Sequence, residues 1–154
     1  MIIPLGIAAL LATTAGPQAT DPASVNVCEK VPGADVAKVL SGTLRSSKPF
    51  ANEDSRSSRC VYIVAASAAP GATSEGLVLW LYDADDYAEL NGVTEAKLEP
   101  VTGLGDKAVR FLDPGDKRHK LRVLRAGRYS LEATAATAAS AAALAKLAVE
   151  RFDR

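Results

Sequence analysis

Hydrophobic and polar residues alternate most regularly over residues 108–134, a pattern that predicts β-strands. We expect three antiparallel strands joined by turns at residues 113–116 and 125–127, with Gly127 at a positive φ. The expected buried face contains Val109, Phe111, Leu121, Val123, Tyr129, Leu131 and Ala133. The expected solvated face contains Arg110, Arg118, Lys120, Arg122, Ser130, Glu132 and Thr134. The segment is therefore predicted to be a three-stranded meander.

The three-residue loop at residues 125–127 fixes the register of this meander, setting Val123 opposite Tyr129 and Lys120 opposite Glu132. A two-residue turn would instead set an apolar side chain, Leu121, against Glu132, which the pleat disfavours. We therefore expect the longer loop.

Two further strands are predicted upstream of the meander. Residues 77–82 are apolar at every position, so we place this strand in the middle of the sheet with both faces covered. Residues 60–65 form a second strand candidate. Residues 44–58 are polar and contain Pro49, which allows at most one edge strand before an exposed loop.

Apolar residues at helical spacing predict short helices within residues 31–40 and 83–92 and a longer, alanine-rich helix over residues 135–152. The apolar stripe of the last helix contains Leu144, Leu147, Ala148 and Phe152. The expected fold class is α+β. It comprises a twisted antiparallel sheet with a C-terminal three-stranded meander, flanked by two short helices and a longer C-terminal helix.

Residues 2–15 are apolar or weakly polar and precede the first charged side chain, Asp21. This run is shorter than the roughly 20 residues that span a bilayer, and small residues follow it, so we expect a secretory signal peptide over residues 1–19. The alternative is an apolar first helix or strand. With 154 residues there is room for a linker at residues 20–27 and a single domain over residues 28–154.

The chain has two cysteines, Cys28 and Cys60. An even count in an exported chain predicts one disulfide, which would stabilise the fold by roughly 3 to 4 kcal/mol. Because export is itself inferred, two buried free thiols are the alternative. Neither cysteine belongs to a Cys-x-x-Cys pair, so we assign no redox, zinc or cofactor residues.

Lys plus Arg and Asp plus Glu both number 18, so the chain lacks the basic excess that nucleic acid binding requires. The charge is unevenly distributed, because residues 83–99 are mostly acidic and a basic strip follows. The strip contains Arg110, Arg118, Lys120 and Arg122. We treat it as a candidate partner surface, with two alternatives: it pairs with the acidic run inside the fold, or it is an ordinary solvated sheet face.

Three local patterns suggest chemistry and are better explained by structure. Residues 103–108 match Gly-x-Gly-x-x-Ala, but the dinucleotide fingerprint requires a helix where residues 107–112 alternate as a strand. Asp83, Asp85 and Asp86 suit a helix N-terminus better than a calcium loop, which needs Gly and Glu at later positions. His119, the only histidine, lies near a hairpin turn without a neighbouring triad motif.

Trp80 and Tyr82 share one face of their strand, and we favour core packing over a ligand platform for these two rings.

Four segments occur in an order that resembles a known group of proteins. They are residues 34–42 after Cys28, residues 60–62, residues 103–108 and residues 144–148. The chain resembles small exported bacterial proteins of unknown function, many of them lipoproteins, akin to the extracellular sensor domain of a mycobacterial serine/threonine kinase. The resemblance implies a disulfide between Cys28 and Cys60 and a twisted antiparallel sheet with flanking helices. It transfers no catalytic residue, and the acylation site of the lipoprotein members is missing here.

We therefore expect an exported, non-catalytic binding or interaction module, periplasmic or extracellular, that contacts an envelope ligand or protein partner. No catalytic, cofactor-binding or metal-binding residue is assigned, and we expect no stable membrane span once the leader is removed. A secreted protein inhibitor and a hydrolase with dispersed catalytic residues are the alternatives. The oligomeric state stays open.

Overall fold

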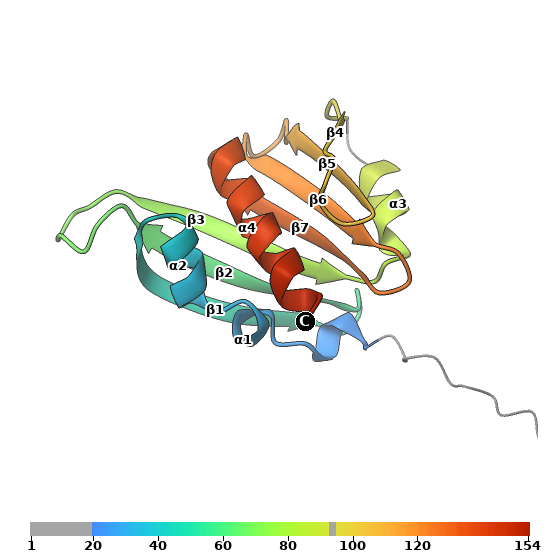
Figure 1. Ribbon diagram of the computed structural model, residues 1–154, viewed down its shortest axis with the longest axis horizontal. Helices are drawn as coiled ribbons and strands as arrows, with labels where there is room; N and C mark the ends of the chain where they lie inside the picture. Colours follow the sequence, from blue (N-terminus) through green and yellow to red (C-terminus); the bar gives the residue numbers. More distant parts are fainter. Residues whose placement is uncertain (1–19, 93–94) are drawn as a thin grey trace, which may run out of the picture.

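A seven-stranded antiparallel sheet is the centre of the fold in the computed structural model, which describes residues 20–92 and 95–154 (Figure 1). The strands are β1 Thr43–Asn52, β2 Ser57–Ala65, β3 Ser74–Tyr82, β4 Glu99–Pro100, β5 Lys107–Leu112, β6 His119–Arg125 and β7 Tyr129–Ala135. Their order across the sheet is β1-β2-β3-β7-β6-β5-β4. The α+β class and the C-terminal meander are confirmed. The polar strand β1 lies at one edge, as Pro49 predicted.

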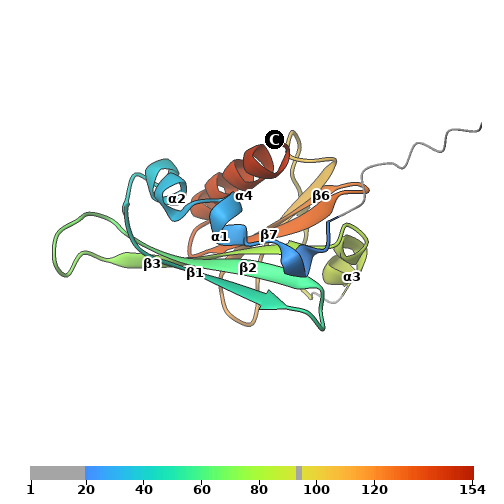
Figure 2. The same ribbon diagram turned by 90° about the horizontal axis from the view of Figure 1, so that it is seen from below.

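The helices are α1 Val27–Lys30, α2 Gly33–Val39, α3 Asp86–Gly92 and α4 Ala138–Phe152, and a 3₁₀ turn, η1 Pro22–Ser24, precedes them. Helices α1, α2 and α4 lie on one side of the sheet, which we call the helix face (Figure 2). The opposite side is the open face, and α3 lies at one end of the sheet. Helix α1 is additional to the predicted helices. Within the described residues, none of the helices has the length and apolarity needed to cross a membrane.

The segment expected to be a linker, residues 20–27, is packed against the domain. Pro22 of η1 is buried, and Val27, the first residue of α1, belongs to the core. The Asn26 side chain caps α1 by accepting hydrogen bonds from the backbone N–H groups of Cys28 and Glu29. The ordered domain therefore begins earlier than expected. The predicted signal peptide, residues 1–19, lies outside the described residues.

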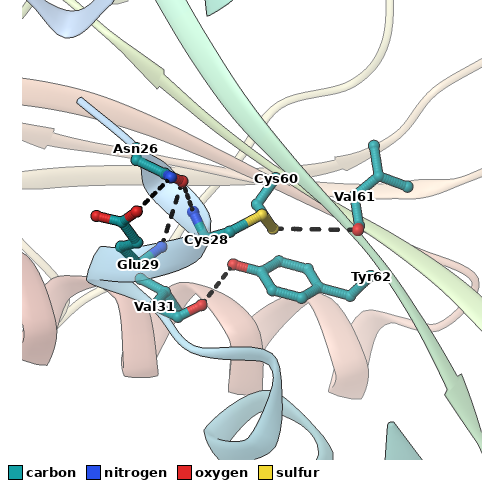
Figure 3. The surroundings of a disulfide bond; sticks show 7 residues. All are labelled: Asn26, Cys28, Glu29, Val31, Cys60, Val61 and Tyr62. Atoms are coloured by element: carbon teal, nitrogen blue, oxygen red, sulfur yellow. Dashed lines mark hydrogen bonds between the residues drawn. A yellow bond between two sulfur atoms is a disulfide. The ribbon is translucent and has the colours of Figure 1, made fainter. Parts of the chain in front are cut away.

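A disulfide joins Cys28 of α1 to Cys60 of β2, which confirms the predicted bridge (Figure 3). The two Cα atoms are 5.1 Å apart, and Cys60 is fully buried. Beside it, the buried Tyr62 hydroxyl donates a 2.8 Å hydrogen bond to the carbonyl of Val31. The start of the domain is thus tied to the first inner strand by one covalent bond and one buried hydrogen bond.

Strand β3 lies between β2 and β7, which confirms its predicted interior position. Its alternate residues Leu77, Leu79 and Leu81 are buried on the helix face. The expectation that both faces would be fully covered is wrong. Trp80 and Tyr82 are only half-buried on the open face, because α1, α2 and α4 all cover the other side.

The predicted register between β6 and β7 is off by two residues. Val123 opposes Leu131 instead of Tyr129, and Lys120 opposes Thr134 instead of Glu132. The loop does have three residues, with Gly127 at φ +68°, but it comprises residues 126–128 and is closed by a different residue pair. A shift of two positions leaves every side chain on its original face, so the apolar pattern alone does not distinguish the two registers.

The face predicted for β5 is also wrong. Arg110 opposes Leu121 across the β5–β6 ladder, whereas Phe111 opposes Lys120. Because opposed residues project to the same side, Val109 and Phe111 lie on the open face and Arg110 on the helix face. The six-residue loop over residues 113–118 sets this pairing, since a loop one residue longer or shorter would reverse every side chain of β5.

Candidate functional site: a groove beside helix α4

Helix α4 does not cover the whole helix face. It packs on β7, β6 and β3, while β5 and β4 extend beyond it toward the sheet edge (Figure 1). A groove of about 510 Å³ lies between the N-terminal half of α4 and β4, β5 and β6. That volume falls within the range of small-molecule binding sites.

The helical wall of the groove is built from alanines, namely Ala138, Ala141 and Ala142. The Thr137 hydroxyl accepts a 3.0 Å hydrogen bond from the Ser140 N–H and caps the helix at this end. Larger side chains on this side of α4 would occupy the groove, whereas methyl groups leave it open. The alanines of α4 therefore keep the groove open in addition to favouring the helix.

The floor of the groove is a row of apolar side chains from the sheet. Leu121 of β6 is buried beneath α4, and Leu112 at the end of β5 is 50% exposed. Val101, in the turn after β4, adds a third apolar side chain. A half-exposed leucine next to a hollow marks surface that a ligand would bury favourably.

Charged and polar groups line the rim. The pairing of β4 with β5 places Glu99 opposite Arg110, and the Arg110 Nε donates a 3.0 Å hydrogen bond to Glu99 Oε2. Lys97 lies two residues before Glu99, and the half-buried His119 opposes Leu112 at the start of β6. An apolar hollow with polar groups at its rim is typical of sites for amphipathic small molecules.

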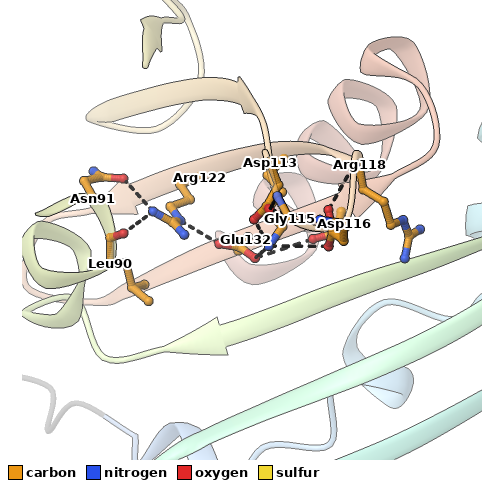
Figure 4. Close-up of polar contacts among 10 residues, drawn as sticks. Leu90, Asn91, Asp113, Gly115, Asp116, Arg118, Arg122 and Glu132 are labelled. Carbon is orange, nitrogen blue, oxygen red and sulfur yellow. Dashed lines mark hydrogen bonds and ion pairs between the residues drawn. The ribbon is translucent and has the colours of Figure 1, made fainter. Parts of the chain in front are cut away.

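The four cations of the predicted partner surface are not on one face. Arg110 projects to the helix face and lines the groove. Lys120 and Arg122 project to the open face, and Arg118 lies in the loop before β6. There Arg122 is 7% exposed and Glu132 is 5% exposed, and the Arg122 Nε donates a 2.6 Å hydrogen bond to Glu132 Oε2 (Figure 4).

Arg122 also fastens α3 to the sheet. Its Nη1 donates to the carbonyl of Leu90 and to Asn91 Oδ1, the latter at 3.2 Å. Its guanidinium lies 4.7 Å from the centre of the Phe111 ring, which explains how Phe111 is buried on the open face. Arg122 is thus a structural residue, and little of it is accessible to a partner.

Lys120 is held by carboxylates from the adjacent loop and strand. Its Nζ is 2.8 Å from Asp113 Oδ2 and 3.8 Å from Glu132 Oε1. Burial opposes the charge of Lys120, but these carboxylates outweigh burial and raise its pKa. The hydrogen bond from Lys120, together with the backbone N–H of Gly115, lowers the pKa of Asp113 to about 2. The strip is therefore largely neutralised within the fold.

The Arg118 side chain points away from this cluster (Figure 4). Its Nη2 donates to the carbonyl of Gly76 in β3. Of the acidic run at residues 83–99, Glu99 pairs with the basic strip, through Arg110. The hypothesis that the two opposed charge clusters bind each other is therefore confirmed for this pair.

The glycine-rich segment at residues 103–108 is a turn into β5, as predicted. Gly103 and Gly105 have φ values of +76° and +64°. The Asp106 N–H donates to the carbonyl of Leu124 at 2.8 Å, and its carboxylate accepts from the Ala126 N–H at 2.9 Å. The segment fastens the end of β6 and does not precede a helix.

The aspartates at residues 83–86 lie at the start of α3, where Asp83 Oδ1 accepts from the Asp85 N–H at 3.3 Å. The Asp83 side chain thus closes the turn immediately before α3, and it also pairs with Arg56 at 3.5 Å. Across residues 20–92 and 95–154, no group of three or more His, Cys, Asp or Glu side chains is arranged to hold a metal ion.

Trp80 and Tyr82 stack on each other with ring centres 5.6 Å apart. The Arg59 guanidinium lies between Trp80 and Phe50, 4.4 Å and 4.7 Å from the two ring centres. The rings therefore stack on the half-buried open face and lie outside the hydrophobic core, so the core packing favoured from the sequence is wrong.

Sequence reasoning had singled out Arg110 and His119 but not the apolar residues of the groove. Leu112 was unassigned, and the alanines of α4 were treated only as helix formers. The position of Leu112 directly before the polar turn at residues 113–116 was the feature of the sequence that could have indicated an exposed apolar side chain. No protein-family model matches this chain, and neither a curated protein nor a solved structure does.

Proposed function

We propose that the protein is an exported, non-catalytic binding module of the bacterial cell envelope that holds a small ligand in the groove beside α4. The observation that carries this proposal is the uncovered helix side of β5 and β4, which leaves a 510 Å³ hollow with the half-exposed Leu112 in its wall. A hollow of this volume with a mainly apolar lining and a few polar groups at its rim is the usual form of a small-molecule binding site.

The rim chemistry favours binding over catalysis. General acid–base catalysis needs a carboxylate or imidazole positioned to exchange a proton with substrate. Here the Glu99 carboxylate accepts the hydrogen bond from Arg110, and both side chains are about half exposed to water. Such a solvated ion pair is better suited to orienting a ligand than to exchanging protons with it.

Export is supported by the disulfide, because disulfides persist mainly outside the reducing cytoplasm. The test is the mass of the full-length gene product recovered from the envelope or medium of a bacterial host. Loss of a leader ending near residue 19 is expected. Recovery of the intact chain from the cytoplasm alone would contradict export.

The binding proposal is tested by a thermal-shift screen of the purified full chain against envelope lipids, glycans and peptides. Ala142→Phe places a ring in the groove and should abolish the shift given by any ligand of this site. Ala34→Phe, at an exposed position of α2, is the matched control and should retain the shift. Shifts that survive Ala142→Phe, or no shift with any compound, would overturn the proposal.

A further inference from the structure

We infer that the groove ligand is a medium- or long-chain carboxylate whose hydrocarbon chain lies against Leu112 and Leu121 and whose head group meets Arg110 and Lys97. This inference rests on the proposed binding function and assigns a chemical class to the ligand. It is carried by the combination of an apolar interior with a cationic rim on one side.

The interior of the groove fits a hydrocarbon chain. Its apolar lining residues come from the sheet, the turn after β4 and helix α4, and they are Val101, Phe111, Leu112, Leu121, Ala138, Ala141 and Ala142. A polar ligand would leave hydrogen-bonding groups unmet against this lining. Each methylene that moves from water into such a site strengthens binding by roughly fourfold.

The rim fits a single negative charge. Lys97 and Arg110 supply two cations, and the third cation among the described lining residues, Lys120, is already paired with Asp113. Glu99 is the one carboxylate among these lining residues. Arg110 uses Nε for Glu99, and a guanidinium has two further nitrogens that can donate to a second carboxylate in the same plane. Glu99 would repel a doubly charged phosphate more strongly than a carboxylate.

His119 extends the polar rim toward the β5–β6 hairpin. It opposes Leu112 in the ladder, so an imidazole and an apolar side chain project together toward the groove. The imidazole can donate a hydrogen bond to a carboxylate from either ring nitrogen. Head group and chain would therefore contact neighbouring residues of the same two strands.

The experiment is isothermal titration calorimetry of the purified full chain with decanoate, butanoate and decyltrimethylammonium. Decanoate should bind, and butanoate, with six fewer methylenes, should bind more weakly by roughly a thousandfold or more. The cationic amphiphile has an alkyl chain one carbon longer and should show no comparable binding. Equal affinities for decanoate and decyltrimethylammonium would overturn the inference, because the rim would then contribute no charge selectivity.

Arg110→Met keeps an unbranched apolar side chain and removes the charge, and decanoate affinity should fall by about tenfold or more. Arg56→Met is the matched control, since Arg56 is 61% exposed against 60% for Arg110 and pairs with Asp21 and Asp83 elsewhere. The control should bind decanoate as the unmodified protein does. Unchanged affinity in Arg110→Met would contradict the inference.

The outcomes separate this inference from the proposed function. If decanoate does not bind while another compound stabilises the protein in an Ala142-dependent manner, the carboxylate class is wrong and the binding function stands. If decanoate binds equally well to Ala142→Phe, the site is wrong.

Discussion

At the scale of single residues, Gly105 is constrained by both its backbone conformation and its surroundings. A Cβ atom there would lie 2.4 Å from Val123 Cγ1 and 2.7 Å from the Leu124 carbonyl oxygen. Gly103 also has a positive φ, but its Cβ would meet no atom within 4 Å. Comparing substitutions at Gly103 and Gly105 therefore distinguishes the cost of a positive φ from the cost of steric overlap within one turn.

We predict that Gly105→Ala lowers the free energy of unfolding by about 2–3 kcal/mol, since the strained φ and the collision with β6 add together. Gly103→Ala, which suffers only the φ penalty, should cost about 1 kcal/mol. Urea denaturation followed by circular dichroism measures both. Equal losses in the two variants would show that the close approach to β6 is not a constraint.

A second residue-scale prediction concerns acid. The pKa of Asp113 is about 2 in the folded protein against an ordinary value of 3.8. Because the folded pKa is the lower one, the stabilisation from Asp113 is complete above about pH 4 and is lost as the pH falls toward 2. Asp113→Asn should flatten the decline of unfolding free energy between pH 4 and pH 2. Parallel declines in the two proteins would contradict the assignment.

At the scale of elements, the buried ion pair between Arg122 and Glu132 connects the meander to α3. We predict that Arg122→Met destabilises the protein by about 3–5 kcal/mol, because it leaves the Glu132 carboxylate buried without its partner. Replacing both, as Arg122→Met with Glu132→Leu, should recover most of that loss. Thermal unfolding of the two variants measures the difference.

Amide hydrogen exchange tests whether Arg122 holds α3 against the sheet. In both variants the amides of α3 should exchange faster, because Leu90 and Asn91 lose their contact with the guanidinium. Unchanged exchange in α3 would indicate that Arg122 does not fasten this helix.

The elements show what a sequence pattern determines. Strands β3, β6 and β7 and helix α4 follow from apolar spacing, because each buries one continuous set of side chains. The side chosen by β5 does not follow, since Phe111 reaches burial by stacking on Arg122 instead of entering the core. Loop geometry decided that register, and alternation within one strand carries no information about it.

The candidate site was less predictable than the fold. The stripe of α4 predicts which side of the helix is buried, but it does not predict how far across the sheet the helix lies. The groove exists because α4 lies over β7 and β6 and stops short of β5. Arg110 lines this groove because β5 presents the opposite face from the expected one, so neither the groove nor this part of its rim followed from the predicted fold.

At the scale of the whole molecule, the disulfide holds together a part of the fold that has few core residues. The loop between Cys28 and Cys60 contains α1, α2 and the exposed edge strand β1. Apart from the bridge, this segment is held to the core mainly by two fully buried apolar side chains, Val31 and Val36. The cross-link reduces the conformational freedom of the unfolded chain over these residues.

We predict that replacing both Cys28 and Cys60 by Ser lowers the free energy of unfolding by about 3–4 kcal/mol, as expected for a loop of this length. Denaturation in the presence of a reducing agent should lower the stability of the unmodified protein to that of the double variant, and leave the double variant unchanged. If reduction has no effect on the unmodified protein, the bridge is not a stabilising cross-link. If reduction does have the expected effect, the fold reaches its full stability only in an oxidising compartment, which would support the proposed export.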